Sequence, residues 1–234
     1  MDVLMSRFRS VRQELGFELQ RFIVLWRYRH QVPPFALWWR LVLKRVVDLV
    51  GGLAILALLS PIMVMLAVLV KLDSPGPILF SQIRMGRLGR VFRIYKFRTM
   101  VQNAEAQTGP VWASPEDDPR VTALGRFLRR SHLDELPQLF NVMAGDMSLV
   151  GPRPERPCFV EQLVQSIPAY DQRLFVKPGM TGLAQVHYRY DQTLADVKRK
   201  LRFDLLYVKR MCLMLDARIL VWTLFVVVTG RGIK

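Results

Sequence analysis

With 234 residues, the chain is long enough for one substantial domain with appendages. A hydrophobic content of 51% combined with a formal net charge of +15 predicts contact with a membrane beside a basic surface that attracts anions. The 26 arginines outnumber the 8 lysines, and the planar guanidinium fork favours phosphate or carboxylate ligands. Cys158 and Cys212 lie too far apart for a metal or redox motif, so we expect them to be reduced and buried.

Residues 1–43 form a basic N-terminal segment. Between residues 4 and 29, apolar side chains recur every three or four positions with arginines among them, which predicts an amphipathic helix that ends at Pro33-Pro34. Such a helix lies either in a membrane interface or against a protein surface, and the pattern does not distinguish the two. The first long apolar run follows many arginines, so we expect no cleavable signal peptide.

Residues 44–72 contain the candidate membrane segment, because positions 49–70 carry no charge and are long enough to span a bilayer. Ser60 and Pro61 fall near its middle, and basic residues flank both sides, which the positive-inside rule places in the cytoplasm. A re-entrant helix hairpin that breaks at these two residues, with the serine hydroxyl bonding a freed carbonyl, fits both observations. A proline inside a plain spanning helix is the alternative.

Residues 73–234 are expected to form a small cytosolic domain. The stretch DSPGPILF predicts a turn and a strand, and residues 91–97 predict a second strand. Three helices follow from apolar periodicity: one with a stripe of Val121, Leu124 and Leu128, one over 194–209, and one over 219–228 that is too short to span a bilayer and is buried or interfacial. The fold class is therefore α/β and mostly α, with a re-entrant membrane helix hairpin and interfacial amphipathic helices beside the small domain.

Two adjacent carboxylates, Asp134 and Glu135, stand in the stretch RRSHLDELPQL. Pro137 is tolerated in the first turn of a helix, where its missing N–H would be unbonded anyway. The helix is therefore expected to begin at Leu133 or Asp134, with both carboxylates at its N-terminus. A helix cap with surface ion pairs explains this spacing at least as well as a reactive site does.

The basic side chains before the pair change what it can do. The helix dipole together with Arg129 and Arg130 would keep Asp134 ionised and would attract a phosphate. An ionised carboxylate beside a phosphate can act as a nucleophile in phosphoryl transfer. A second carboxylate next to it, here Glu135, can hold Mg²⁺, which lets two anions approach each other.

Three further stretches carry basic groups that suit an anion. In GPRP, two prolines bracket Arg153 and fix the backbone on both sides, which favours bidentate recognition of a phosphate or a base edge. KPGMTG combines Lys177 and Thr181 with two glycines in a loop able to turn backbone amides toward an anion. RIYKFRTM adds Lys96 and Arg98. The first two stretches are otherwise ordinary turns, and the third is otherwise a solvated strand edge.

Together and in this order, the segments resemble the bacterial sugar transferase family, the monotopic phosphoglycosyl transferases that use polyprenyl phosphate. The resemblance runs from about Lys44 to the C-terminus. It rests on KRVVDLVGGLAILALLSP, DSPGPILFSQIRMGRLGRVFRIYKFRTM, LDELPQLFNVMAGDMSLVGPRPE, KPGMTGLAQV and LDARILVWTLFVVVTGRG. This many ordered matches are far more specific than any one of them.

The resemblance implies a catalytic domain on the cytoplasmic face of the bacterial inner membrane, in contact with its lipid. Asp134 would attack the β-phosphorus of a UDP-sugar and expel UMP, and polyprenyl phosphate would then accept the phosphosugar. By the same match, Glu135 assists through Mg²⁺ or proton handling, so the pair would supply the metal ligands. The expected substrate-binding residues are Arg129, Arg153, Lys96, Arg98, Lys177 and Thr181.

The chain departs from the family in two places. His132 stands where a small or basic residue is expected, and a neutral surface histidine is the simplest interpretation. Larger members carry spanning helices ahead of this region, whereas here a basic segment precedes it, so we expect a compact member. AQVHYRYD is similar to exopolysaccharide-initiating members, which hints at glucose or galactose.

Two rival classes are weighed against this family. A nucleic-acid binder is disfavoured, because the basic residues are spread over every segment and no recognised nucleic-acid module is present. A single-span membrane scaffold leaves the clustering of GPRP, KPGMTG and the acidic pair unexplained. The sequence leaves open the identity of the sugar, the role of Glu135 and whether the chain forms a homo-oligomer.

Overall fold

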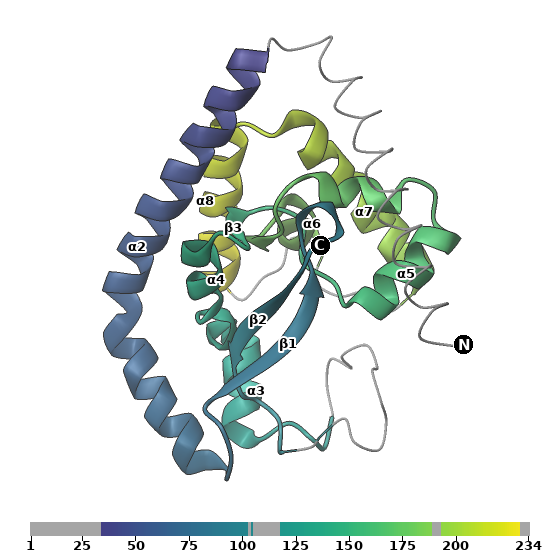
Figure 1. The fold of residues 1–234 in the computed structure, drawn as a ribbon. Helices are drawn as coiled ribbons and strands as arrows, with labels where there is room; N and C mark the ends of the chain where they lie inside the picture. Colours follow the sequence, from purple (N-terminus) through teal and green to yellow (C-terminus); the bar gives the residue numbers. More distant parts are fainter. Residues whose placement is uncertain (1–33, 103, 105–117, 189–192, 230–234) are drawn as a thin grey trace, which may run out of the picture.

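The computed structural model describes residues 34–102, 104, 118–188 and 193–229, so the helix expected over residues 4–29 lies outside the described part. A long helix flanks a small domain of short helices and two small sheets (Figure 1). In chain order, the longer elements are α2 (Pro34–Asp73), β1 (Leu79–Met85), β2 (Val91–Phe97), α3 (Ala123–Ser131), α4 (Gln138–Ala144), β3 (Ser148–Val150), α5 (Pro157–Ser166), β4 (Gly179–Thr181), α6 (Leu183–His187), α7 (Leu194–Arg210) and α8 (Leu213–Thr229). The single 3₁₀ turns are η1 (Arg87–Gly89), η2 (Leu133–Glu135) and η3 (Tyr170–Phe175).

Helix α2 runs as one bowed helix of 40 residues, with Pro61 in its interior (Figure 1). The sequence predicted that the helix would break at this point, and it does not. Pro61 has no N–H, so the carbonyl of Ala57, four residues earlier, loses its helical partner. The Ser60 hydroxyl donates to this carbonyl at 2.9 Å, which confirms the expected part played by the serine.

The outward face of α2 is apolar and exposed. Among the described residues it is the one helix long and apolar enough to cross a membrane, over Trp39–Asp73, and only 17% of its most apolar stretch is buried. Leu58 and Leu72 are 77% and 78% exposed. An apolar surface of this length and exposure is suited to lipid rather than to water. The structure thus supports membrane association through α2.

Near its start, α2 is joined to later elements by buried polar contacts. Asp48 accepts hydrogen bonds from the Ser148 hydroxyl at 2.9 Å and from the backbone N–H of Leu149 at 3.0 Å, both through Oδ1. Lys44 donates to Asp216 of α8 at 2.7 Å. The membrane helix therefore fixes the position of β3, the strand that leads directly into the GPRP stretch.

Near its end, α2 is held by the same domain. The buried side chain of Arg98, just after β2, donates to the carbonyl oxygens of Val70 at 3.2 Å, Ser74 at 2.6 Å and Pro75 at 3.0 Å. The Val70 carbonyl belongs to the last turn of α2, where carbonyls lack a helical partner, and those of Ser74 and Pro75 directly follow the helix. One guanidinium satisfies all three. Both ends of α2 thus bind one folded unit.

Both predicted strands are confirmed. β1 and β2 form an antiparallel hairpin, in register from Leu79 opposite Phe97 to Met85 opposite Val91. A second, parallel pair joins β3 to β4, with Ser148 beside Gly179. KPGMTG was predicted to be a loop able to turn backbone amides toward an anion, and this is wrong in part. Its residues Gly179–Thr181 form β4, and the Gly179 amide donates to the Pro152 carbonyl at 3.0 Å.

The core forms where α4, β3, α6, α7 and α8 meet, around residues such as Leu139, Val150 and Tyr207. The helices expected from the apolar stripe at 121–128, over 194–209 and over 219–228 appear as α3, α7 and α8. Cys158 and Cys212 are free thiols, as predicted, but the predicted burial is wrong, because both lie on the surface.

Candidate active site

The acidic pair lies on a turn whose geometry is set by His132. This exposed residue adopts a left-handed conformation, with φ of 58°, and its backbone N–H ends α3 by bonding carbonyls of that helix. The chain then enters η2, which carries Asp134 and Glu135, and Pro137 stands at the start of α4. The predicted helix start at Leu133 or Asp134 is correct only in part: a 3₁₀ turn begins at Leu133, but the α-helix begins at Gln138, after the acidic pair.

Glu135 is held by two cations from different elements. Lys96 of β2 donates to Oε1 at 2.6 Å. Arg153 of the GPRP stretch approaches as a fork, with Nη1 donating to Oε2 at 3.1 Å and Nη2 donating to Oε1. The structure thus brings together three residues that the sequence separates widely, and both carboxylate oxygens of Glu135 are engaged.

Asp134 is buried at 7% exposure, and no hydrogen bond or ion pair joins its carboxylate to another described residue. Burial raises the pKa of Asp134 from its ordinary 3.8 to about 6; Lys96 and Arg153 oppose this rise and Glu135 adds to it. From the sequence, Arg129 and Arg130 were predicted to keep Asp134 ionised. At neutral pH it is still mostly ionised, but burial outweighs the arginines in setting its pKa.

The charges of Glu135 and Lys96 follow from their contacts. Burial alone would raise the pKa of Glu135, but Arg153 and Lys96 together hold it well below its ordinary value. Burial lowers the pKa of Lys96, and the attraction of Glu135 offsets only part of that effect. The two carboxylates therefore differ: Glu135 is a fixed anion between cations, and Asp134 is buried and has no bonded partner in the described part of the chain.

The GPRP stretch mounts Arg153 rigidly, as its two prolines predicted. Its backbone carbonyls accept bonds on three sides: Pro152 from the Gly179 amide at 3.0 Å, Arg153 from the Arg173 side chain at 2.8 Å, and Pro154 from the Arg84 side chain at 3.2 Å. A side chain at Gly179 would collide with the backbone of Gly151, so only glycine allows this close approach. The Arg153 side chain is 46% exposed, so a ligand can reach it.

Sequence reasoning missed two polar residues that position the site. Arg173 is 9% exposed and forms an ion pair with the buried Asp204 of α7, with Nε donating at 3.0 Å. Asn141 of α4 clamps β2, because its Oδ1 accepts from the Tyr95 amide at 3.2 Å and its Nδ2 donates to the Arg93 carbonyl at 2.8 Å. A polar residue in an otherwise apolar helical register, as in LPQLFNVMAG, was the available signal for Asn141.

Arg129 lies at the edge of the site. It is half-buried on the last turn of α3, and its Nε donates to Thr99 at 2.9 Å. Its charge acts on Asp134, whose pKa it lowers slightly against the larger effect of burial. A contact between Arg129 and substrate stays a prediction.

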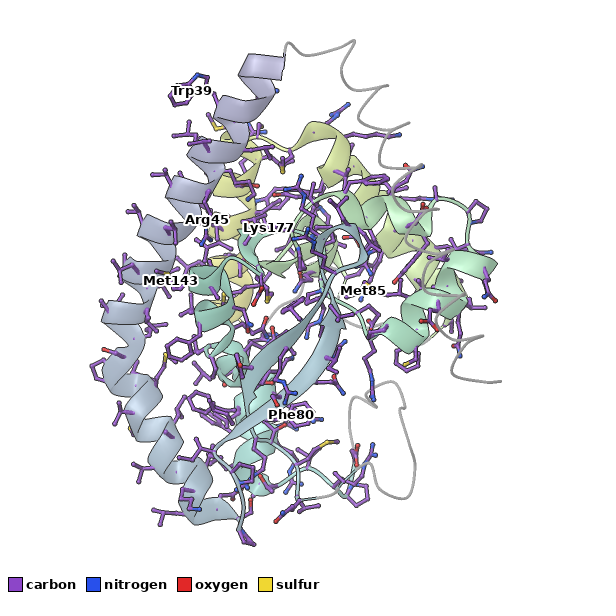
Figure 2. The ribbon with its side chains drawn as sticks, in the orientation of Figure 1. Trp39, Arg45, Phe80, Met85, Met143 and Lys177 are labelled. Atoms are coloured by element: carbon purple, nitrogen blue, oxygen red, sulfur yellow. The ribbon has the colours of Figure 1, made fainter. Side chains whose placement is uncertain are left out.

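Three of the expected substrate-binding residues make their contacts elsewhere than at the acidic pair. Arg98 caps the end of α2, so the structure gives it a role in the fold. Thr181 is buried, and its hydroxyl shares a 2.7 Å hydrogen bond with Thr223 of α8. Lys177 lies with Arg45 around Gly145, at the end of α4 (Figure 2). Burial and the charge of Arg45 lower the pKa of Lys177. The structure joins none of these three to the acidic pair by a hydrogen bond.

The donor set for a metal is small. The part of the chain that the structure describes contains no cluster of three or more His, Cys, Asp or Glu side chains. Mg²⁺ often binds through one or two carboxylates together with substrate phosphates and water, so an acidic pair can suffice. Because both oxygens of Glu135 already accept from cations, Asp134 fits this requirement better than Glu135 does.

The fold and the site define a membrane-associated α/β protein in which a buried carboxylate lies among basic side chains. The family described as "Bacterial sugar transferase" matches residues 39–230, and the chain belongs to this family.

Three relatives illustrate the match. A protein of Aeromonas hydrophila named UDP-N-acetylgalactosamine-undecaprenyl-phosphate N-acetylgalactosaminephosphotransferase is 45% identical over 192 residues, which cover 82% of this chain and 45% of that protein. The UDP-glucose:undecaprenyl-phosphate glucose-1-phosphate transferase of Escherichia coli (strain K12) is 43% identical, over 78% of this chain and 39% of its own length. The exopolysaccharide production protein PSS of Rhizobium leguminosarum bv. phaseoli is 41% identical, over 82% of this chain and 98% of that protein. The chain thus spans less than half the length of the first two and almost all of the third.

Proposed function

We propose that this chain transfers a sugar 1-phosphate from a UDP-sugar to undecaprenyl phosphate and so begins the assembly of a bacterial surface polysaccharide. The observation that carries the proposal is the difference in bonding between the two carboxylates of the acidic pair. Glu135 is bonded to Lys96 and Arg153, and the buried Asp134 beside it has a carboxylate without a bonded partner among the described residues. The names of the relatives supply the donor and acceptor classes.

In the first step, a carboxylate oxygen of Asp134 attacks the β-phosphorus of the donor, and the bond from this phosphorus to the oxygen of UMP breaks. In the second step, a phosphate oxygen of undecaprenyl phosphate attacks the same phosphorus and displaces Asp134, which regenerates the carboxylate. A buried carboxylate with a pKa near 6 is ionised at neutral pH yet poorly solvated, which suits a nucleophile.

The basic residues have two roles in this proposal. Arg153 is held rigidly, with one side of its guanidinium bonded to Glu135, and its other N–H groups can donate to the oxygens of a phosphate. Arg129 adds positive charge at the edge. Glu135 holds the guanidinium of Arg153 in position, and the positive charge of Lys96 offsets the negative charge that Glu135 brings beside Asp134. Mg²⁺ would be held by Asp134 and the diphosphate oxygens, and when bound it would neutralise phosphate charge.

We further propose that α2 is re-entrant in the cytoplasmic membrane, with Ser60 and Pro61 at the deepest point and the small domain on the cytoplasmic face. The bow of the helix supports this topology, as does the attachment of both flanks of its uncharged segment to one domain, through Lys44 before the segment and Arg98 after it. A straight crossing would place the two ends on opposite sides of a hydrocarbon core about 30 Å thick.

The first test is the nucleotide released by the membrane-reconstituted protein with Mg²⁺, undecaprenyl phosphate and a panel of UDP-sugars. We expect UMP from the wild type and none from Asp134→Asn. The exposed Asp146, changed to Asn, serves as the matched control and should keep activity. Release of UDP would show transfer of the sugar alone and would exclude the covalent step at Asp134. The productive donor identifies the sugar.

The proposed re-entrant topology of α2 is tested separately, by labelling single cysteines from each side of the membrane. Because Cys158 and Cys212 are both exposed, they are first replaced by serine. Single cysteines at Ser6 and Ser81, on the two sides of α2, are then labelled from the cytoplasmic and the periplasmic face. Re-entry predicts cytoplasmic labelling at both positions, and labelling of one of them from the periplasm would exclude it.

A further inference from the structure

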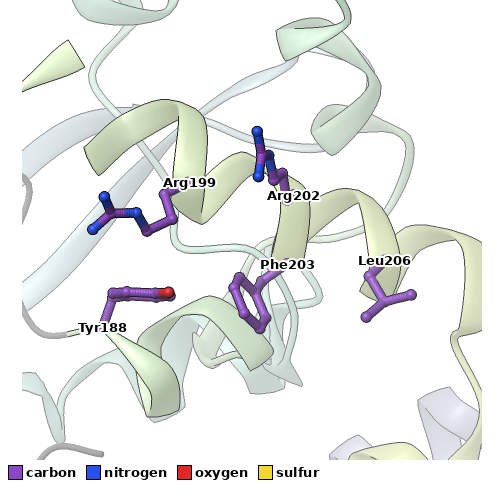
Figure 3. Close-up of a pocket in the computed structure, with 5 residues that line it drawn as sticks. All are labelled: Tyr188, Arg199, Arg202, Phe203 and Leu206. Carbon is purple, nitrogen blue, oxygen red and sulfur yellow. The ribbon is translucent and has the colours of Figure 1, made fainter. Parts of the chain in front are cut away.

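A second basic site lies on α6 and α7, among residues that the proposed chemistry does not use. It is a pocket of about 430 Å³ lined by Tyr188, Arg199, Arg202, Phe203 and Leu206 (Figure 3). The two arginines project from α7 on one side of the pocket, with the rings of Tyr188 and Phe203 on the other. None of the five lining residues forms a hydrogen bond or ion pair with the acidic pair, with Lys96 or with Arg153 in the described part of the chain.

The charges of this pocket favour an anion. Arg199, Arg202 and Leu206 follow one another at intervals of three and four residues, so they share one face of α7. The side chain of Arg199 is 56% exposed, and it forms a long ion pair of 4.0 Å with Asp196 of the same helix. No described acidic side chain pairs with Arg202, which is exposed. Two guanidinium groups one helical turn apart repel each other, and an anion bound between them removes this cost.

An aromatic row connects the pocket to the apolar surface of α8. Tyr188 and His187 both pack on Phe203, with ring centroids 5.4 Å and 4.9 Å apart. On its other side, His187 meets Trp222 of α8, edge to face, at 5.3 Å. Trp222 is 40% exposed. Rings of this kind are typical of the depth at which lipid headgroups meet acyl chains.

Around Trp222, α8 is covered with exposed apolar side chains and lies beside α2 (Figure 1). The most exposed of them, between 43% and 67%, are Met214, Val221, Leu224, Phe225 and Val227. The arginines, the aromatic row and the apolar face thus form a continuous path from a phosphate-sized positive charge to a surface suited to hydrocarbon. A free nucleotide or sugar phosphate has no apolar chain to occupy the second half of this path.

We propose that Arg199, Arg202 and Tyr188 bind the phosphate headgroup of an anionic membrane phospholipid, whose acyl chains lie along His187 and Trp222 and over α8. Such a lipid would fix the α7–α8 side of the domain at the membrane surface. This inference rests on membrane association and does not depend on the proposed catalytic function.

The test uses Trp222 as a reporter in the full chain, reconstituted in vesicles. Brominated acyl chains quench nearby tryptophan, and the difference between the wild type and Trp222→Phe isolates this one residue. Brominated phosphatidylglycerol in a phosphatidylcholine membrane is compared with brominated phosphatidylcholine at the same mole fraction in a phosphatidylglycerol membrane. Two arginines near a membrane surface predict local enrichment of the anionic lipid on the order of tenfold, and quenching of Trp222 should be stronger accordingly.

The variant Arg199→Gln/Arg202→Gln should abolish the stronger quenching of Trp222 by brominated phosphatidylglycerol. Lys209→Gln/Arg210→Gln removes the same charge from exposed positions at the end of α7 and should keep it. A preference that survives the first variant, or one that is absent in the wild type, would overturn the proposal.

Two further measurements complete the design. Arg199→Lys/Arg202→Lys preserves the charge and should retain part of the preference, which separates loss of the site from loss of the fold. Undecaprenyl phosphate is then added as a competitor at a small mole fraction. If it removes the quenching preference, the occupant is the acceptor lipid and the phospholipid assignment fails. No UDP-sugar or turnover is needed, so an inactive protein leaves the result interpretable.

Discussion

The Arg173 guanidinium donates to the backbone carbonyl of Arg153 at 2.8 Å while it forms an ion pair with Asp204 of α7. One buried side chain thus connects the core to the segment that presents the phosphate-matching fork. The position of Arg153 is set by this contact as well as by its two flanking prolines.

Arg173→Lys should reduce kcat/KM for UMP release on the order of tenfold to a hundredfold. Lysine can keep the ion pair with Asp204, but it lacks the planar fork that also reaches the Arg153 carbonyl. The melting temperature should fall only modestly. Arg87→Lys is the control, because Arg87 donates to Phe175 in the same region from an exposed position. Full activity in a folded Arg173→Lys protein would show that the carbonyl contact does not position Arg153.

The first half-reaction should depend on pH through Asp134. The nucleophile must be ionised, and its pKa is about 6, so kcat/KM should rise with pH up to about that value and then level off. Single-turnover UMP release across the acidic range measures this limb. A limb centred near the ordinary aspartate value of 3.8 would contradict the burial of this carboxylate.

Glu135→Gln should move the acidic limb of the kcat/KM profile to lower pH. Glu135 raises the pKa of Asp134 by its negative charge, whereas Lys96 and Arg153 lower it and would remain. The variant should also lose activity, because it releases the bond that holds Arg153 in place. The control is Glu155→Gln, which removes a carboxylate paired with Arg84 at 2.8 Å. A shift of the limb to higher pH would mean that Glu135 acts on Asp134 mainly through the two cations.

Asp134→Asn should stabilise the fold at neutral pH while abolishing activity. The native-state pKa of about 6 lies above the ordinary 3.8, so the ionised group costs stability above pH 6 and costs nothing below the unfolded-state pKa. The shift corresponds to about 3 kcal/mol at most. Chemical denaturation of the detergent-solubilised protein should therefore show an advantage for the variant at neutral pH that shrinks as the pH falls toward 4. Equal stability of both proteins at neutral pH would contradict the cost of burying this charge.

Ser60→Ala should destabilise α2 only when Pro61 is present. In the wild type, the serine hydroxyl satisfies the Ala57 carbonyl that the proline leaves unbonded, and its loss should cost about 1 kcal/mol. In a Pro61→Ala background, the new N–H at position 61 can bond this carbonyl, so the cost should disappear. A double-mutant cycle from denaturation in detergent measures the coupling, and additive effects would show that the hydroxyl does not compensate for the proline.

The sequence alone determined most local structure and the grouping of functional motifs. The alternation and β-branched content of VFRIYKF predicted β2 with its correct bounds, and apolar spacing predicted α3, α7 and α8. These signals are local, because strand and helix periods report which face of an element is buried. The prolines of GPRP likewise predicted a rigid Arg153, since they restrict the backbone wherever the segment lies.

The tertiary structure decided what each polar group does. Arg98 and Arg153 were both predicted to bind substrate, yet Arg98 caps α2 and Arg153 faces the acidic pair. Asp134 and Glu135 are neighbours, yet only Glu135 is held by cations from β2 and the GPRP stretch. The reason is physical: the pKa and the role of a buried charge depend on its desolvation and on partners brought from distant parts of the chain, and residue spacing carries neither quantity.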